Sequence, residues 1–186
     1  MPHNLPAQRH LETERPSPLV RRFAAQIISS SNVNPALDIA CGSGRNAIFL
    51  ALAGCDVICV DRDLTALRNR YDSFAAGQQI ADHLRLQEMD LSKDPWPFES
   101  NSAGAIINVH FLLPALLPSF ENSLIPGGYL VIESIPAHGG NYLKLPRAGQ
   151  LHSALQESFD FELYKERKAG PGNYDAVAVQ TVARRR

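Results

Sequence analysis

Residues 37–47 read Leu37-Asp38-Ile39-Ala40-Cys41-Gly42-Ser43-Gly44-Arg45-Asn46-Ala47, a short apolar run followed by a glycine turn and the start of a helix. Glycine has no Cβ to hold a ligand away from the backbone, and the first amides of the following helix offer donors with a partial positive charge. A Gly-x-Gly turn alone is a weak signal. Ala47 stands where a dinucleotide fingerprint has its third glycine, although alanine is tolerated there. The stretch predicts a ligand at a strand-to-helix turn.

Short apolar strands alternate with amphipathic helices on both sides of this turn, a pattern typical of parallel strands joined by helical crossovers. We expect strands at 36–40, 56–60, 84–89, 105–109 and 129–135, and helices at 19–28, 45–53, 63–77, 113–124 and 149–157. Strands at 159–166 and 174–182 are joined by a turn at 170–173, so we expect them to pair antiparallel. The fold class is α/β. It is a doubly wound Rossmann-like sheet, mostly parallel with an antiparallel C-terminal strand and helices on both faces.

Length and composition limit the classes of protein. The 186 residues are 45% hydrophobic and 20% charged, which fits one domain spanning 1–186, with residues 1–16 as a flexible arm and 184–186 as a solvated tail. A net charge of −1 disfavours nucleic-acid and membrane partners. The polar start lacks the apolar centre of a secretory signal, and the apolar run 105–117 is too short and interrupted to span a bilayer. We therefore expect a cytoplasmic protein.

The cysteines and histidines do not indicate a metal or redox site. Cys41, Cys55 and Cys59 are odd in number and form no Cys-x-x-Cys pair, which favours core packing over a disulfide framework, zinc binding or nucleophilic catalysis. The six histidines show no ligand spacing. The expected metal content is none.

An acidic residue follows the second predicted strand. Asp61 lies about 20 residues after the glycine turn, where an acid accepts hydrogen bonds from the ribose hydroxyls of a nucleoside cofactor. The alternative is a helix cap, but Asp63 is better placed to cap the next helix. We expect Asp61 to contact ribose.

Taken together, the run 38–44, the strand-end Asp61, Met89-Asp90-Leu91 and the turn 126–128 resemble class I S-adenosylmethionine-dependent methyltransferases. The resemblance covers residues 17–183. Within that superfamily, the runs 44–47 and 15–18 are similar to those of the small bacterial tellurite-resistance and thiopurine-type methyltransferases.

The resemblance implies S-adenosyl-L-methionine as cofactor and a role for each matching residue. Asp38 would lie beneath the methionine part, Gly42 and Gly44 would let the cofactor approach, and Asp61 would hold the ribose. Arg62 would lie along the adenine, Asp90 would bind the adenine amino group, and the Leu91 amide a ring nitrogen. Asp90 could instead be a turn residue opening 92–94. The expected cofactor-binding set is completed by Ala40, Arg45 and Asn108.

The end of the fourth predicted strand matches the place where the family positions its acceptor. His110 is the first candidate base and Glu133 the second, although a lone histidine in an apolar segment is more often a packing residue. Asn108 could equally orient a loop. The acidic or Asn-Pro-Pro-Tyr signature of many amino-group methyltransferases is missing here, which disfavours that acceptor class.

Two further segments could form part of an acceptor pocket. The loop 138–142 is either a lid or an ordinary surface loop. Arg147 could meet an anionic acceptor, although a surface arginine is the more common case.

The sequence thus predicts a methyltransferase acting on a small molecule, with a thiol or a chalcogen oxyanion as candidate acceptor. A soft acceptor of this kind needs little help from a base. Two alternatives remain open: a non-catalytic S-adenosylmethionine-binding regulatory protein, and an NAD-dependent oxidoreductase. The oxidoreductase would leave Asp38, the turn 126–128 and the terminal antiparallel pair unexplained.

Overall fold

The computed structural model describes residues 15–75, 79–134, 143–172 and 175–186. The helices and strands follow in the order α2 (Pro18–Arg22), α3 (Ala24–Ser30), β1 (Ala36–Ile39), α4 (Arg45–Leu52), β2 (Val57–Asp61), α5 (Thr65–Ala75), η1 (Gln79–Asp82), β3 (Leu84–Glu88), β4 (Ala103–Val109), η2 (Pro114–Leu116), α6 (Leu117–Ser123), β5 (Leu124–Glu133), α7 (Gln150–Leu155), β6 (Phe159–Ala169) and β7 (Ala176–Arg185).

The strands form one seven-stranded sheet in the order β3-β2-β1-β4-β5-β7-β6. Strands β1 to β5 are parallel, whereas β7 pairs antiparallel with both β5 and β6. The predicted fold class and the antiparallel terminal pair are therefore confirmed. The strand order reverses between β1 and β4, which places a crevice at the carboxyl ends of these two strands.

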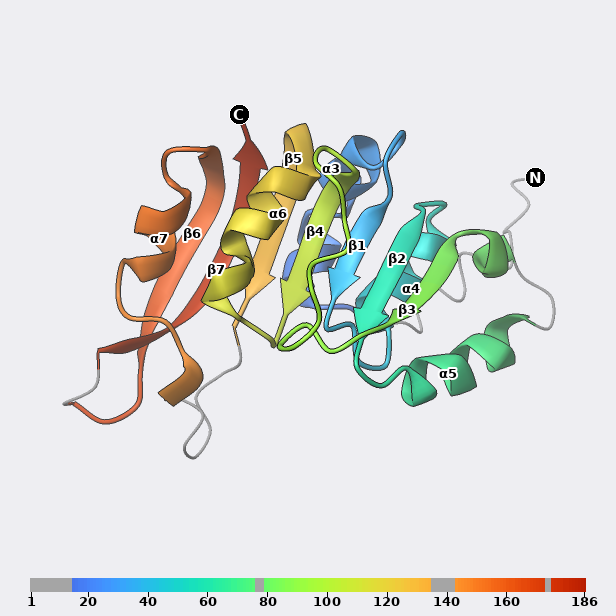
Figure 1. Cartoon of the computed structure of the whole chain (residues 1–186), viewed down its shortest axis with the longest axis horizontal. Helices are drawn as coiled ribbons and strands as arrows, with labels where there is room; N and C mark the ends of the chain where they lie inside the picture. The colour runs from blue at the N-terminus through green and yellow to red at the C-terminus, as the bar shows by residue number, and fades with distance from the viewer. Residues whose placement is uncertain (1–14, 76–78, 135–142, 173–174) are drawn as a thin grey trace, which may run out of the picture.

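Helices cover both faces of the sheet, as Figure 1 shows. On one face α2, α3 and α4 pack against the sheet in a buried cluster that includes Phe23, Ile27 and Phe49. On the other face α6 and α7 contribute Phe120 and Leu151 to a second buried cluster. Burial on both sides explains why β4 has no exposed residue along its whole length.

Two predicted helices are each divided in the structure. The predicted helix 19–28 is interrupted at Phe23, whose backbone angles of φ −106° and ψ 17° close α2 and precede α3. The predicted helix 113–124 begins instead with the 3₁₀ turn η2 and continues as α6. Ser17 starts this part of the fold as predicted, since its side chain accepts a hydrogen bond from Leu19 N.

The segment 126–128 was expected to be a turn before a strand, but it lies within β5. The register advances from Leu124 to Tyr129 on β5 while β4 advances only from Ala103 to Ala105, so β5 bulges here. Gly127 has φ +82°, and a Cβ on Gly128 would lie 2.8 Å from the carbonyl oxygen of Gly104. The glycines therefore allow a bulge in a continuous strand rather than ending one.

The C-terminal arginines were expected to form a solvated tail, and this expectation is wrong. Strand β7 extends to Arg185, whose guanidinium donates to Asn101 Oδ1 at 2.8 Å and to the carbonyl of Leu124. Arg186 donates to Asp160 Oδ1 at 2.8 Å and to the carbonyl oxygen of Glu157 at 2.7 Å. These acceptors come from distant segments, so their proximity was not visible in the local sequence.

Candidate functional site

The candidate site begins at the turn between β1 and α4, where three residues have left-handed backbone angles. Gly42 has φ +55° and Gly44 has φ +73°, and a Cβ built on Gly42 would meet no atom within 4 Å. Gly44 precedes α4 as its N-cap, and its amide donates to the carbonyl of Cys41 at 2.9 Å. The open space beside Gly42 is the feature that a closely approaching ligand requires.

The third left-handed residue, Ala40, is one of the predicted cofactor-binding residues, but the sequence does not reveal its left-handed backbone. It has φ +55°, a conformation that costs an ordinary L-residue roughly 1–2 kcal/mol. The turn is therefore strained at the position before Cys41. Such strain tends to gather at functional sites. In the sequence, Ala40 lies between a predicted strand and two glycines. Residue propensities alone do not predict a left-handed alanine there.

Asp61 ends β2 and faces the glycine turn. Its Oδ2 accepts a hydrogen bond from Gly42 N at 2.8 Å, and its Oδ1 accepts one from Asp63 N at 3.2 Å. Each carboxylate oxygen has more than one acceptor position, so both oxygens can accept further donors. The contact with Gly42 brings the two predicted cofactor elements together. The ribose role of Asp61 stays a prediction.

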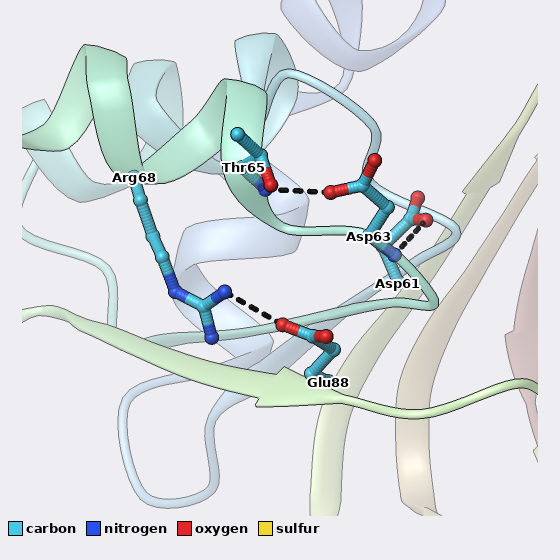
Figure 2. A network of polar contacts seen from close by, with 5 residues as sticks. All are labelled: Asp61, Asp63, Thr65, Arg68 and Glu88. Atoms are coloured by element: carbon cyan, nitrogen blue, oxygen red, sulfur yellow. Dashed lines mark hydrogen bonds and ion pairs between the residues drawn. The ribbon is translucent and has the colours of Figure 1, made fainter.

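Figure 2 shows how the segment after Asp61 is fixed. Asp63 Oδ1 accepts from Thr65 N at 2.9 Å, so Asp63 caps α5 as expected, and this hydrogen bond lowers the pKa of Asp63. Arg68 on α5 forms an ion pair with Glu88 on β3 at 2.6 Å. Both partners are half-exposed, so the pair contributes little to stability but orients α5 across the ends of β2 and β3.

Asp38 and Asn108 are buried polar groups on neighbouring strands of the crevice. Asp38 is 1% exposed, and its Oδ2 accepts from Ala47 N in the first turn of α4 at 3.1 Å. Burial raises the pKa of Asp38 from 3.8 to about 7, against the lowering effects of the Ala47 hydrogen bond and the Arg45 charge. A buried carboxyl of this kind would be stabilised in its charged form by a nearby cation.

Asn108 lies at the end of β4, paired in register with Ile39, and is fully buried. Its Nδ2 donates to the carbonyl of Ile39 at 3.2 Å, whereas its Oδ1 finds no donor in the part of the chain that the structure describes. A buried acceptor without a partner is costly, and a ligand is one of its ordinary explanations. The cofactor role of Asn108 remains a prediction that this geometry favours.

Asp90 lies in the tight turn that was the alternative to its adenine role. Its Oδ1 accepts from Ser92 Oγ at 2.5 Å and from Ser92 N at 3.1 Å, while Oδ2 pairs with Lys93 Nζ at 2.9 Å. These contacts, the Ser92 hydroxyl first, hold the pKa of Asp90 well below its usual range. The backbone amide of Leu91 has no acceptor among the residues described. The adenine roles of Asp90 and Leu91 are left as predictions, and the turn is established.

His110 is exposed, so the packing role considered for it does not apply. Its backbone is left-handed with φ +64°, and its amide donates to the Glu133 carbonyl at 2.6 Å. A left-handed histidine at the carboxyl end of a central strand is an uncommon conformation that tends to occur at functional sites. His110 therefore lies exposed at the carboxyl-end edge of the sheet, and its role as a base stays a prediction.

Glu133, the second candidate base, is held by hydrogen bonds on both carboxylate oxygens. Ser17 Oγ donates to Oε2, and Gln180 Nε2 donates to Oε1 at 2.8 Å. Ser17 is itself held, because its amide donates to Asn46 Oδ1 at 2.8 Å. We refer to Asn46, Ser17 and Glu133 as the α2 tether. It joins the first turn of α4 to the end of β5 across the crevice edge.

Sequence reasoning missed this tether. Glu133 and Ser17 are 116 positions apart, and Asn46 had been quoted only as part of the glycine-turn motif. The buried Ser17 and Asn46 are the signal in the structure, since polar side chains are seldom buried without partners. Of the predicted arm only residues 15–16 are described, and Pro16 is buried next to the tether.

The other candidates occupy the rim of the site or lie outside it. Arg45 is the first residue of α4, Arg62 is exposed beside Asp61, and Arg147 is exposed with its amide donating to Gln150 Oε1 at 3.0 Å. The loop 138–142 lies outside the described residues. All three cysteines are buried and unbridged, as core packing requires.

The structure contains neither a metal cluster nor a membrane helix within its described ranges. No group of three or more His, Cys, Asp or Glu side chains could hold a metal ion there. None of the helices in those ranges combines the length and apolarity that a membrane span needs.

Residues 36–128, half of the chain, match the family described as "Methyltransferase domain". Among curated proteins, Hemagglutinin 1 of Eikenella corrodens is 33% identical over 102 residues, which are 53% of this chain and 33% of that protein. The chain therefore spans about a third of the length of the curated relative it matches.

Solved structures share the fold at low sequence identity. An S-adenosylmethionine-dependent methyltransferase from Mesorhizobium loti superposes with a TM-score of 0.63 at 16% identity, covering 91% of this chain and 99% of that one. TehB from Haemophilus influenzae superposes with a TM-score of 0.62 at 16% identity, covering 97% of this chain and 65% of that one. These likenesses establish the fold.

Proposed function

The chain belongs to the methyltransferase domain family, of class I, whose cofactor is S-adenosylmethionine, and on that premise we propose that it methylates a small-molecule acceptor. An organic thiol or a chalcogen oxyanion is the proposed acceptor class. The proposal rests on two buried polar side chains in the crevice whose interactions are incomplete. Asp38 is a buried carboxyl with a raised pKa, and Asn108 Oδ1 is a buried acceptor without a donor in the described chain.

The residues of the crevice fit this cofactor by their chemistry. An ammonium group would add a second cation near Asp38, beside the charge of Arg45, and would supply the donor that Asn108 Oδ1 lacks. The open left-handed backbone at Gly42 would accept the close approach of a ligand, and Asp61 beside it would accept from ribose hydroxyls. We assign Ala40, Gly44, Arg45 and Arg62 to the walls of the same site. Asp90 and Leu91 would bind the adenine end.

When bound, the cofactor supplies a methyl group on a sulfonium, which is already activated for in-line displacement. The protein's part is then to align the acceptor and exclude water, an orientation effect worth roughly 7–11 kcal/mol. The α2 tether supports this part, because it fixes the start of α2 against the end of β5 at the side where an acceptor would enter. Glu133 acts in this proposal as a positioning residue.

His110 is the remaining candidate for proton removal. A thiol, with a pKa of about 8.5, is partly ionised near neutral pH and strongly nucleophilic as the thiolate, so it needs little help, whereas a hydroxyl or amine acceptor would need a base at the methyl-transfer position. Glu133 is less suited because both of its oxygens already accept hydrogen bonds. His110 is exposed and left-handed at the end of β4, so its ring is the group we assign to that role.

Calorimetric titration with S-adenosylhomocysteine tests the cofactor assignment, with NADH as a parallel ligand. We expect Asp61→Ala to lose about ten- to a hundredfold in affinity, the equivalent of charge-assisted hydrogen bonds worth roughly 1.5–3 kcal/mol. Asp56→Ala is the matched control, because Asp56 is exposed directly before the other end of β2 and pairs with His83. Equal affinity of both variants would reject the role of Asp61.

Formation of S-adenosylhomocysteine with a panel of thiols, chalcogen oxyanions, hydroxyls and amines then tests the reaction. Turnover of a thiol or an oxyanion supports the proposed acceptor class. Binding of S-adenosylhomocysteine without turnover of any acceptor would favour a non-catalytic cofactor-binding protein instead. Binding of NADH alone would reject the proposal.

A further inference from the structure

We propose that a pocket between α6 and α7 binds a compact apolar ring system carried by the methyl acceptor. The inference rests on the proposed function and narrows its acceptor class. The pocket has a volume of about 260 Å³. Figure 1 shows α6 and α7 side by side on the same face of the sheet, and both contribute to the buried cluster on that face.

One wall of the pocket comes from the segment that follows His110. Leu112 lies two residues beyond the candidate base, Pro114 opens η2, and the buried Leu117 starts α6. This segment leaves the carboxyl end of β4, the edge at which methyl transfer is proposed. This wall of the pocket is thus joined in the chain to the candidate base, and in this proposal a molecule seated in the pocket presents its reactive atom toward the crevice.

The opposite wall comes from α7 and the segment before it. The carbonyl oxygen of the buried Pro146 accepts a hydrogen bond from Val177 N at 2.9 Å, which holds this wall against the start of β7. Leu151 is 2% exposed and forms part of the floor, whereas Ala154 is exposed at the rim. Proline rings and leucine side chains give the pocket a lining with few hydrogen-bonding groups. The fixed φ angle of proline makes the walls stiff, so the empty pocket resists collapse.

The size of the pocket indicates the size of its occupant. An engineered apolar cavity of roughly 150 Å³ in another protein holds one benzene ring. A pocket of about 260 Å³ therefore accommodates two fused rings. Burying such a ring system against leucine and proline removes apolar surface from water, which is the main favourable contribution in sites of this kind.

The polar groups that line the pocket argue against an inorganic anion as its ligand. Glu121 carries negative charge, and its Oε1 accepts from Ser158 Oγ at 2.6 Å. Gln150 is already fixed through its Oε1 by the Arg147 amide. A chalcogen oxyanion would meet a carboxylate and apolar walls. Of the two proposed acceptor classes, the pocket favours an organic thiol attached to an aromatic ring system.

Binding of indole, a neutral bicyclic probe, tests the pocket without requiring turnover. We expect indole to bind, and Ala154→Trp, which fills the rim, to weaken this binding at least tenfold. Ser153→Trp is the matched control, because Ser153 is the exposed neighbour on α7 that does not line the pocket. Its indole affinity should stay close to that of the unmodified protein. Circular dichroism and S-adenosylhomocysteine titration of each variant verify folding and the cofactor site.

The outcomes separate this inference from the proposed function. If S-adenosylhomocysteine binds but indole does not, or if both tryptophan variants bind indole equally, the pocket assignment is rejected and the cofactor assignment stands. If indole binds but S-adenosylhomocysteine does not, the proposed function is rejected. With both bound, naphthalene-2-thiol should be methylated with a KM at least tenfold below that of 2-mercaptoethanol, and Ala154→Trp should remove this advantage. Equal KM values would overturn the acceptor class.

Discussion

Replacement of Asp38 by asparagine should change how the stability of the protein depends on pH. Burial raises the pKa of Asp38 to about 7 in the folded state, against 3.8 as its ordinary value. Asparagine has the same shape and keeps a carbonyl oxygen that can accept from Ala47 N, but it does not titrate. The variant therefore removes one titration and little else.

The sign and size of the effect follow from proton linkage. A raised folded-state pKa gives stability that is fully present below the unfolded pKa and is lost as pH rises through the folded pKa. Between these values the folded state holds a proton that the unfolded state has released, so the free energy of unfolding falls by about 1.4 kcal/mol per pH unit. The interval between the two pKa values gives a total loss of stability of about 4 kcal/mol, which is complete about one pH unit above the folded-state pKa.

Urea unfolding of both proteins from pH 5 to pH 8 measures this effect. Other titrating groups are shared, so they largely cancel when the free energy of Asp38→Asn is subtracted from that of the unmodified protein. This difference should fall by about 2 kcal/mol between pH 5 and pH 7 and level off by about pH 8. A difference that stays constant over the whole range would refute the buried, proton-holding state of Asp38.

The same carboxyl makes a second, ligand-linked measurement possible. If an ammonium group binds beside Asp38, it favours the ionised form, and binding below pH 7 releases a proton. Calorimetry of S-adenosylhomocysteine binding in buffers of different ionisation enthalpy counts this proton. The number of protons released on binding should be lower for Asp38→Asn. An unchanged number would show that Asp38 does not interact with the bound ammonium group.

Three other variants test the site. Ala40→Gly should be neutral or stabilise by up to about 1 kcal/mol in urea unfolding, because relief of the left-handed strain outweighs the added freedom of the unfolded chain; a clear loss would contradict the strain. Ser17→Ala should cost about 1–2 kcal/mol, since it removes a helix cap and the donor to Glu133, whereas Ser153→Ala, at an exposed position of α7, should cost little. His110→Ala should leave S-adenosylhomocysteine affinity unchanged and slow the methylation of hydroxyl or amine acceptors more than that of thiols; a uniform loss would argue against a base.

The cofactor side of the site could be predicted because its determinants are local in sequence. Gly42 and Asp61 can each be identified from their residue type and their position after a predicted strand. Parallel strands bring their carboxyl ends to one edge of the sheet, so the two residues are expected to lie close together. Their mutual hydrogen bond needs no information beyond that arrangement. Asp90 shows the limit of this reasoning, since the same residue type serves a turn, and only its contacts with Ser92 and Lys93 revealed the turn.

The acceptor side depended on contacts between distant segments, and local patterns did not predict it. Glu133 is the second candidate base because it lies near the end of a strand where the resembling family builds its acceptor pocket, but Ser17 and Gln180 meet it only after the sheet has formed. The pocket between α6 and α7 arises in the same way, from loops that no short motif connects. The bulge at Gly127 was missed because proline and glycine also mark turns, and the register of β4 decides between the two.

The position of β7 has a consequence for how the chain is made. β7 lies between β5 and β6 in the sheet, although it follows β6 in the sequence. A nascent chain that has been synthesised only as far as β6 must therefore wait, with the β5 edge unpaired, until β7 leaves the ribosome. During that interval the free edge of β5 is a template for pairing with other chains. Stalled or truncated products ending before Ala176 should therefore aggregate rather than fold.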